Sequence, residues 1–186
     1  MPGRQGSRHV SLHCRRTCVT CMAPTQDAAR ESGLARKLRG VRRITISLPG
    51  TLLQETSAAQ LEDGASVVDG TPALLRAVLQ HCEVFLLCRV ESDVGEAAVR
   101  GVLEDAGVCG RAGGQVAPHR VLFCGTAVGS TSLVRQLEPD LHVDGDTATV
   151  KELQRFLPRL LLVGGGVVAS GNVSCVASLQ EAWGVV

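Results

Sequence analysis

Two short segments carry residue types that could transfer a phosphoryl group or a proton. Ser47-Leu-Pro-Gly-Thr51 follows a β-branched run that is typical of a strand, so Ser47 would stand at the end of that strand. Asp144-Gly-Asp146 follows another apolar run and brings two carboxylates close together. Phosphoryl transfer through an aspartyl intermediate needs a carboxylate nucleophile and a second carboxylate that moves protons, and both help to hold magnesium. The first segment has neither carboxylate.

That first segment resembles the nucleophile loop of haloacid-dehalogenase-like enzymes, Asp-x-Asp-Gly-Thr-Leu. The two catalytic carboxylates are replaced by Ser47 and Pro49, and a proline can neither bind a metal nor transfer a proton. Cys88-Arg89-Val90 occupies the position where such enzymes place a phosphate-binding Ser or Thr. We therefore expect no catalytic residue, metal or cofactor, and interpret Asp144-Gly-Asp146 as a polar turn and helix cap. The alternative is a haloacid-dehalogenase-like phosphatase or phosphate-binding protein.

The N-terminal part of the chain contains a further constellation. His9, His13, Cys18 and Cys21 could supply four zinc ligands, because Cys18-Val-Thr-Cys21 has zinc-ligand spacing. No second knuckle follows at the usual distance, and the surroundings offer no apolar core to fold a finger. We therefore expect no metal here, with zinc binding as the alternative.

Charge is distributed unevenly along the chain. Residues 1–43 hold ten Arg and Lys against two acidic residues, whereas the remainder holds nine basic and sixteen acidic residues. A basic arm of this kind could touch an anionic membrane, nucleic acid or an import receptor, act as an organelle transit peptide, or remain a solvated, disordered leader. The aromatic content of 2 % argues against stacking on single-stranded nucleic acid. No run approaches the ~20 apolar residues that span a bilayer.

The elements that would position these residues alternate along the chain. The patterns predict strands at 44–48, 84–90, 121–124, 141–143 and 160–163, and helices at 71–81, 93–106, 130–137 and 149–157. This alternation favours a three-layer, Rossmann-like (degenerate haloacid-dehalogenase-like) α/β domain with a mostly parallel five-stranded sheet and helices on both faces. We expect a leader at 1–40, the α/β domain at 41–163, and a Gly-rich turn with a C-terminal segment packing on the domain at 164–186. Within that segment, 179–183 could form a short helix.

Two segments without catalytic logic are the most distinctive. His119-Arg-Val-Leu-Phe-Cys124 and Val134-Arg-Gln-Leu-Glu-Pro-Asp-Leu-His-Val-Asp144 closely resemble the plant peroxisome biogenesis protein 22 family. The segments 43–50, 103–107 and 171–184 agree in order. The resemblance covers about residues 40–186.

The resemblance implies a role rather than a reaction. Members are peroxisomal membrane proteins whose cytosolic α/β domain binds and activates the peroxisomal ubiquitin-conjugating enzyme (peroxin-4 type), which ubiquitinates the matrix-protein import receptor so that it can be recycled. We expect a non-catalytic adaptor at the cytosolic face of the peroxisomal membrane, with no nucleic acid and no small-molecule substrate. Residues 1–40 show no membrane anchor of the family's kind. We therefore expect either a shortened or alternative product that lacks the anchor, or peripheral attachment through partners or the basic leader. The protein would be cytosolic if the anchor is truly absent.

The candidate partner-binding residues form the most distinctive polar stretch, at a helix end that enters a strand. They are Arg135, Gln136, Glu138, Pro139 and Asp140. The alternative is that Arg135 and Glu138 or Asp140 pair locally and only fix that corner.

Overall fold

Six short strands form one parallel sheet in the computed structural model, which describes residues 33–166, 168 and 170–184. The strands lie in the order β3-β2-β1-β4-β5-β6, and every neighbouring pair is parallel. Their bounds are β1 Arg43–Ser47, β2 Glu83–Arg89, β3 Val121–Cys124, β4 Leu141–Asp144, β5 Leu160–Val163 and β6 Val173–Val176. The predicted parallel three-layer α/β fold is confirmed, with six strands rather than five.

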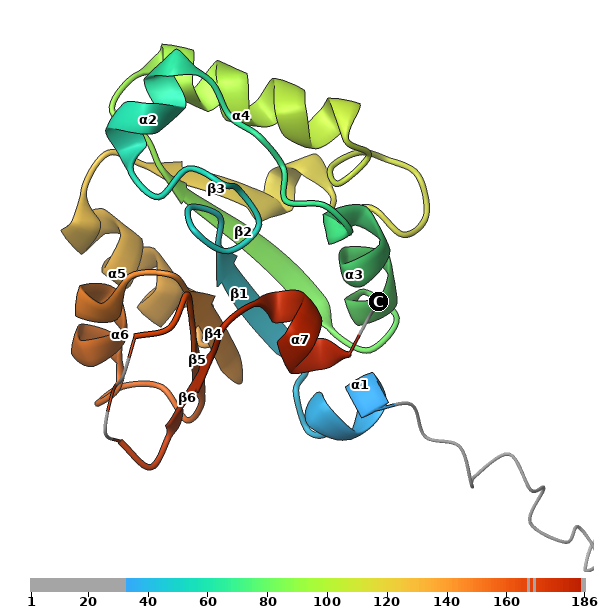
Figure 1. Ribbon diagram of the computed structural model, residues 1–186, viewed down its shortest axis with the longest axis vertical. Helices are drawn as coiled ribbons and strands as arrows, with labels where there is room; N and C mark the ends of the chain where they lie inside the picture. Colours follow the sequence, from blue (N-terminus) through green and yellow to red (C-terminus); the bar gives the residue numbers. More distant parts are fainter. Residues whose placement is uncertain (1–32, 167, 169, 185–186) are drawn as a thin grey trace, which may run out of the picture. The chain divides into compact units, whose positions relative to one another are not determined.

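Helices connect the strands and cover both faces of the sheet. Their bounds are α1 Gly33–Lys37, α2 Ala58–Asp63, α3 Thr71–Val78, α4 Asp93–Asp105, the 3-10 helix η2 Pro118–Arg120, α5 Ala127–Leu137, α6 Thr147–Leu153 and α7 Leu179–Trp183. Figure 1 shows α5 and α6 on one side of the sheet and α1, α3 and α7 on the other. Several helices begin at a side chain that accepts backbone N–H groups of the first turn, as Ser92 does for α4 and Thr126 for α5.

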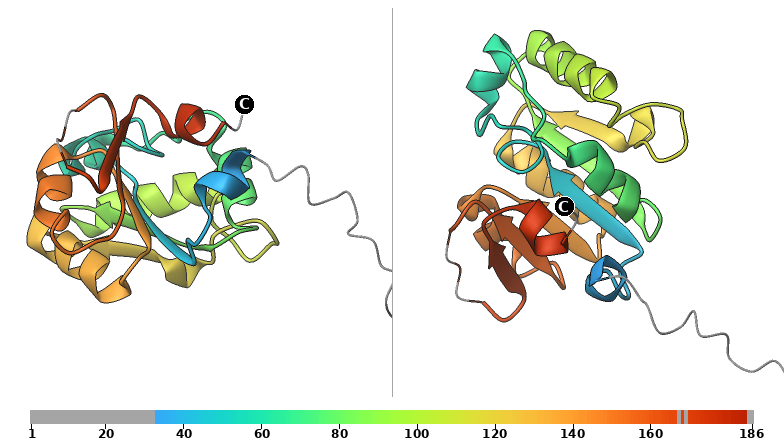
Figure 2. Two further views of the ribbon diagram at one scale, coloured as in Figure 1. Left: turned by 90° about the horizontal axis from the view of Figure 1, so that it is seen from below. Right: turned by 45° about the vertical axis from the view of Figure 1, so that its right-hand side comes forward.

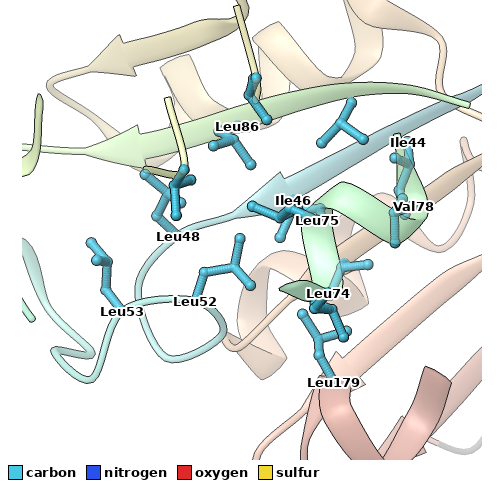
Figure 3. Close-up of a cluster of buried hydrophobic side chains, with 14 of the residues drawn as sticks. Ile44, Ile46, Leu48, Leu52, Leu53, Leu74, Leu75, Val78, Leu86 and Leu179 are labelled. Carbon is cyan, nitrogen blue, oxygen red and sulfur yellow. The ribbon is translucent and has the colours of Figure 1, made fainter. Parts of the chain in front are cut away.

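The larger core lies between the sheet and the helices α3, α4 and α7. Ile44 and Ile46 of β1 and Leu86 of β2 are fully buried there, against leucines that include Leu74 of α3 and Leu179 of α7 (Figure 3). Burying one such side chain contributes roughly 1.5–3 kcal/mol. A smaller cluster fills the opposite face under α5 and α6. The β1–β4 region is therefore held from both sides.

Residues 33–40, which the sequence assigned to the leader, form an ordered part of the domain. Helix α1 lies beside α7 (Figure 2), Leu34 and Leu38 are buried in the larger core, and Lys37 Nζ donates to the carbonyl oxygen of Ala182. The domain therefore begins before residue 41, where the sequence places its boundary. The two leucines lie one helical turn apart and face the core, but this pattern is too short to stand out in a basic segment. The leader residues 1–32, with His9, His13, Cys18 and Cys21, lie outside the described residues.

The segment after β5 adds the sixth strand and the last helix. Gly164 and Gly165 turn the chain with φ of 97° and 82°, a region that glycine adopts without strain. Strand β6 then pairs with β5 at the sheet edge, and Trp183 of α7 is 4 % exposed in the core. Among the described helices, none has the length and apolar character needed to cross a bilayer.

Candidate functional site

A polar cavity opens at the carboxyl end of the sheet, where β1 and β4 lie side by side. Strands β2 and β3 lie on one side of β1, and β4, β5 and β6 lie on the other, so the strand order reverses between β1 and β4. In doubly wound sheets ligands bind at this switch in strand order. The cavity has a volume of about 380 Å³, and its lining includes Ser47, Pro49, Arg89, Ser130, Asp144 and Asp146. The structure thus brings together the residues that the sequence singled out as remnants of phosphoryl-transfer chemistry.

Backbone hydrogen bonds fold the loop after β1, which carries Ser47 and Pro49 in place of acids. Leu48 N–H donates to Leu87 O at 2.8 Å, and Gly50 N–H donates to Glu55 O at 2.8 Å, so the loop folds tightly at the cavity floor. Gly145 of the β4 loop approaches so closely that an added Cβ would lie 3.0 Å from Pro49 O. Close backbone contact between the two loops therefore defines the cavity, and a side chain at position 145 would disturb it.

Asp144 is tied into a buried polar network. Its Oδ2 lies 3.2 Å from His142 Nε2, and His142 Nδ1 lies 2.8 Å from the hydroxyl of Thr45 on β1. Thr45, His142 and Asp144 are 0 %, 1 % and 3 % exposed. In the tautomer that donates through Nε2 to the Asp144 carboxylate, His142 accepts a hydrogen bond from the Thr45 hydroxyl at Nδ1. Asp144 Oδ1 accepts from Asp146 N–H at 2.8 Å. One oxygen of Asp144 therefore positions His142, which links β4 to β1, and the other oxygen fixes the turn at Asp146.

Asp146 is the N-cap of α6, as the sequence predicts. Its carboxylate accepts from Ala148 N–H at 3.0 Å, from Thr149 N–H at 3.2 Å and from the Thr149 hydroxyl at 2.7 Å. Burial acts to raise the pKa of this carboxyl, but these hydrogen bonds outweigh it and leave the pKa below its usual value. Asp146 is thus a capping carboxylate at the rim of the cavity.

The donor set at the cavity does not fit a magnesium ion. The positions that would supply two carboxylates hold the Ser47 hydroxyl and Pro49. The oxygens of Asp144 and Asp146 accept hydrogen bonds from the protein. Within the described part of the chain, no three His, Cys, Asp or Glu side chains converge as a metal site would require. We derive no catalytic step through a metal here.

The cysteines near the cavity are thiols with low nucleophilicity. Burial, with the neighbouring Cys124 adding to it, raises the pKa of Cys88 to about 12. Burial also raises the pKa of Cys124. A thiol with a raised pKa is largely protonated at neutral pH, so it is a poor nucleophile.

The five predicted partner-binding residues lie at the opposite, amino end of the sheet. Arg135 and Gln136 are exposed in the last turn of α5. Glu138 caps this helix in the left-handed region at φ 47° and is also exposed, whereas Pro139 is buried. The stretch therefore combines exposed polar side chains with a fixed corner of the backbone.

Asp140 stabilises the fold at this corner. Its carboxylate accepts the backbone N–H groups of Arg42 at 2.8 Å and of Arg43 at 3.1 Å, and its backbone N–H donates to Arg43 O at 3.0 Å. The hydrogen bond from Arg42 is the main reason that the pKa of Asp140 lies below its usual value. The side chain thus joins β4 to β1, and its ion-pair partner is Arg42 at 3.8 Å rather than Arg135.

Phe156 joins this corner and was not anticipated from the sequence. The ring is 44 % exposed and lies between two guanidinium groups, with its centroid 4.2 Å from Arg135 and 4.7 Å from Arg155. A shallow hollow of about 430 Å³ beside it includes Glu138 and Pro139 in its lining. We call the surface formed by Arg135, Gln136, Glu138, Pro139 and Phe156 the amino-end patch. The sequence could have indicated Phe156 as a surface residue of interest, because it is one of few aromatic residues in the chain and lies at the end of an expected helix.

Comparisons with known proteins agree on a family and on a fold. The family model described as Peroxisome biogenesis protein 22, Haloacid dehydrogenase-like domain, matches residues 36–183. Peroxisome biogenesis protein 22 of Arabidopsis thaliana is 38 % identical over 122 residues, which are 66 % of this chain but only 42 % of the relative's length. The chain thus spans less than half the length of this curated relative.

Two solved phosphatases share the fold at low identity. The D,D-heptose 1,7-bisphosphate phosphatase of B. bronchiseptica, solved with magnesium and phosphate, is 15 % identical with a TM-score of 0.55, covering 77 % of this chain and 96 % of its own. The enzyme of the same name from Burkholderia thailandensis is 10 % identical with a TM-score of 0.54, covering 75 % and 94 %. These likenesses show the fold alone and nothing about activity.

Proposed function

The chain belongs to the peroxisome biogenesis protein 22 family, and from that membership we propose that it is a non-catalytic adaptor. In this proposal it binds and activates the peroxisomal ubiquitin-conjugating enzyme, of the peroxin-4 type, at the cytosolic face of the peroxisomal membrane. Activation of that enzyme supports ubiquitination and recycling of the import receptor, and so matrix protein import.

The state of the carboxyl-end cavity carries the proposal. The fold is that of phosphatases, yet the nucleophile loop presents Ser47 and Pro49, and both oxygens of Asp144 are used within the protein. A scaffold that keeps its backbone without the reacting carboxylates suits a role based on surface complementarity. Turnover of a phosphate ester that requires magnesium and is abolished by Asp144→Ala would overturn the non-catalytic part.

The amino-end patch supports a place for the partner. Arginine and aromatic side chains are enriched among the residues that dominate binding energy, and Arg135 stacked on a half-exposed Phe156 supplies both. The stack also restricts the arginine before binding, which lowers the entropic cost of association. Gln136 and Glu138 flank it as exposed polar groups.

The test uses the full chain and the purified ubiquitin-conjugating enzyme from peroxisomes of the same source. We expect specific capture of that enzyme and faster ubiquitin-chain formation when the adaptor is added. Arg135→Glu should weaken both, and Arg89→Glu, a charge reversal at the carboxyl end, should change neither. The adaptor proposal fails if the folded full chain neither captures the enzyme nor alters its rate. If both charge reversals act alike, only the assignment of the patch fails.

The cellular location has its own test. A fluorescent reporter fused after the last residue of the chain should mark peroxisomes, and protease added to intact organelles should remove it. Import of the reporter into mitochondria or plastids would sink the peroxisomal placement, because it would identify the Arg-rich leader as a transit peptide.

A further inference from the structure

Helix α1 and the turn after it present a strip of basic side chains. Arg36, Lys37, Arg39 and Arg42 are all exposed, and the side chain of Arg42 is 91 % exposed. No acidic residue occurs between positions 33 and 54. We call these four residues the α1 strip.

The strip is fixed to the domain. Leu34 and Leu38 on the inner side of α1 are 6 % and 3 % exposed, and Lys37 Nζ is tied to the Ala182 carbonyl of α7. Basic side chains in the last turn also suit the negative end of a helix, but α1 has only five residues, so this effect is small. The strip is therefore a positioned surface.

Acidic residues near the strip neutralise it only in part. Asp140 lies 3.8 Å from the Arg42 side chain and Glu181 lies on the adjacent α7. The larger acidic group is at the carboxyl end of the sheet, in the segments that follow β1 and β2: Glu55, Glu62, Asp63, Asp69, Glu91 and Asp93. These acidic segments therefore lie at the end of the sheet away from α1.

We propose that the α1 strip contacts an anionic lipid surface and orients the domain on it. The 32 residues that precede α1 add five arginines against two acidic residues, so the sequence continues the charge of the strip. Each such Lys or Arg increases the affinity for an anionic lipid surface by about fivefold. Added salt weakens this attraction. The exposed charges are spread without an aromatic stacking platform, so a charged surface suits them better than single-stranded nucleic acid.

The strip and the amino-end patch meet at one corner, because Arg42 lies 3.8 Å from Asp140, the residue after Pro139, but they extend over opposite faces of the sheet. Helix α1 packs into the core on one face of the sheet. Val134 of α5 and Leu153 of α6 pack on the other face, next to the patch residues Arg135 and Phe156 (Figure 1). The lipid contact needs no ubiquitin-conjugating enzyme, so it stands or falls independently of the adaptor proposal.

The experiment is co-sedimentation of the full chain with vesicles of phosphatidylcholine, with or without phosphatidylserine. We expect binding to the anionic vesicles only, weakened by added salt. The variant Arg36→Glu/Lys37→Glu/Arg42→Glu should bind at least roughly tenfold more weakly. The variant Arg76→Glu/Arg111→Glu/Lys151→Glu makes the same charge change elsewhere on the exposed surface and should stay within about twofold of wild type.

Circular dichroism establishes that each variant is folded, and the milder Arg36→Gln/Lys37→Gln/Arg42→Gln replaces the first if it is not. The proposal is overturned if the strip variant binds as tightly as wild type, since the leader alone would then account for binding. Equal loss in both triple variants would also overturn it, because net charge would then explain the effect. Strip-dependent binding to duplex RNA, with none to anionic vesicles, would identify a different partner and equally refute it.

Discussion

The two ends of the sheet differ in how their polar side chains are used. At the carboxyl end, Asp144 and Asp146 line a cavity, but their oxygens hold a histidine, a turn and a helix N-terminus. At the amino end, Asp140 and the Arg43 guanidinium hold backbone groups at the corner, and Arg135 and Phe156 remain on the surface. The polar side chains at the carboxyl end are thus used within the protein, while the amino end keeps Arg135 and Phe156 exposed, where we propose that the partner binds.

Under the adaptor proposal, this difference shows how a fold can keep a cavity at the place of an active site without the reaction. The cavity persists because backbone contacts build it, such as the approach of Gly145 to the Pro49 carbonyl. Those contacts do not depend on the carboxylates that phosphoryl transfer requires. A cavity at the expected place in a doubly wound sheet therefore does not establish catalysis, and the side chains have to be examined one by one.

Replacing Asp144 should change the free energy of unfolding more than the other substitutions, because Asp144 supports the fold. Asp144→Ala leaves His142 Nε2 and the backbone N–H of Asp146 without their acceptor inside the protein, so it should lower the free energy of unfolding by about 2–3 kcal/mol. Ser47→Ala, in the same cavity, should change it by less than about 0.5 kcal/mol. Urea denaturation followed by circular dichroism measures both. An Asp144→Ala protein as stable as wild type would show that the network does not support the fold.

The next effect concerns the amino end. Phe156→Ala removes the ring under Arg135 and should weaken binding of the ubiquitin-conjugating enzyme by about 1–2 kcal/mol, roughly five- to thirtyfold. Stability should fall by less, because the ring is already 44 % exposed. Calorimetric titration gives the affinity, with Val94→Ala as the control, since Val94 is an exposed apolar residue on a different helix. Equal losses in the two variants would remove the distinction between the patch and ordinary surface.

The smallest effect is the pH dependence that Asp140 contributes. Because its pKa is lowered in the folded protein, its stabilising effect is present above the pKa of the unfolded state and is lost as the pH falls through the folded-state pKa. Asp140→Asn should therefore lower stability at neutral pH by less than about 1.5 kcal/mol and flatten the loss of stability below about pH 4. Urea midpoints from pH 6 downward measure this. An unchanged acid profile would contradict the role of Asp140 at the β1–β4 corner.

Most elements could be predicted from sequence, including the short strands β3, β4 and β5, whereas α1, α2 and β6 could not. Continuous apolar runs and capped amphipathic helices predicted β2, α3 and α4 close to their observed bounds. Strand β6 was missed because Val173–Val176 has only four residues with a polar centre, and it is defined by its pairing with β5. Helix α1 was assigned to the leader because its two core leucines are outnumbered by basic residues. Tertiary packing determines such elements more than local pattern does.

The candidate sites show the same limit. The loss of catalytic carboxylates at Ser47 and Pro49 could be predicted because it depends on residue identity alone. The network of Thr45, His142 and Asp144 could not, because it requires the register that pairs Thr45 with His142. Phe156 was likewise missed, since only the packing of α5 beside α6 brings it under Arg135.

Amide hydrogen exchange on the full chain, with and without the ubiquitin-conjugating enzyme, shows which surface the partner covers. We expect slower exchange in the enzyme's presence at 135–140 and 154–159, at the amino end, and no change at 47–51 and 144–149 around the cavity. Protection confined to the cavity loops would contradict this expectation, because the partner would then occupy the place where the related fold performs its chemistry.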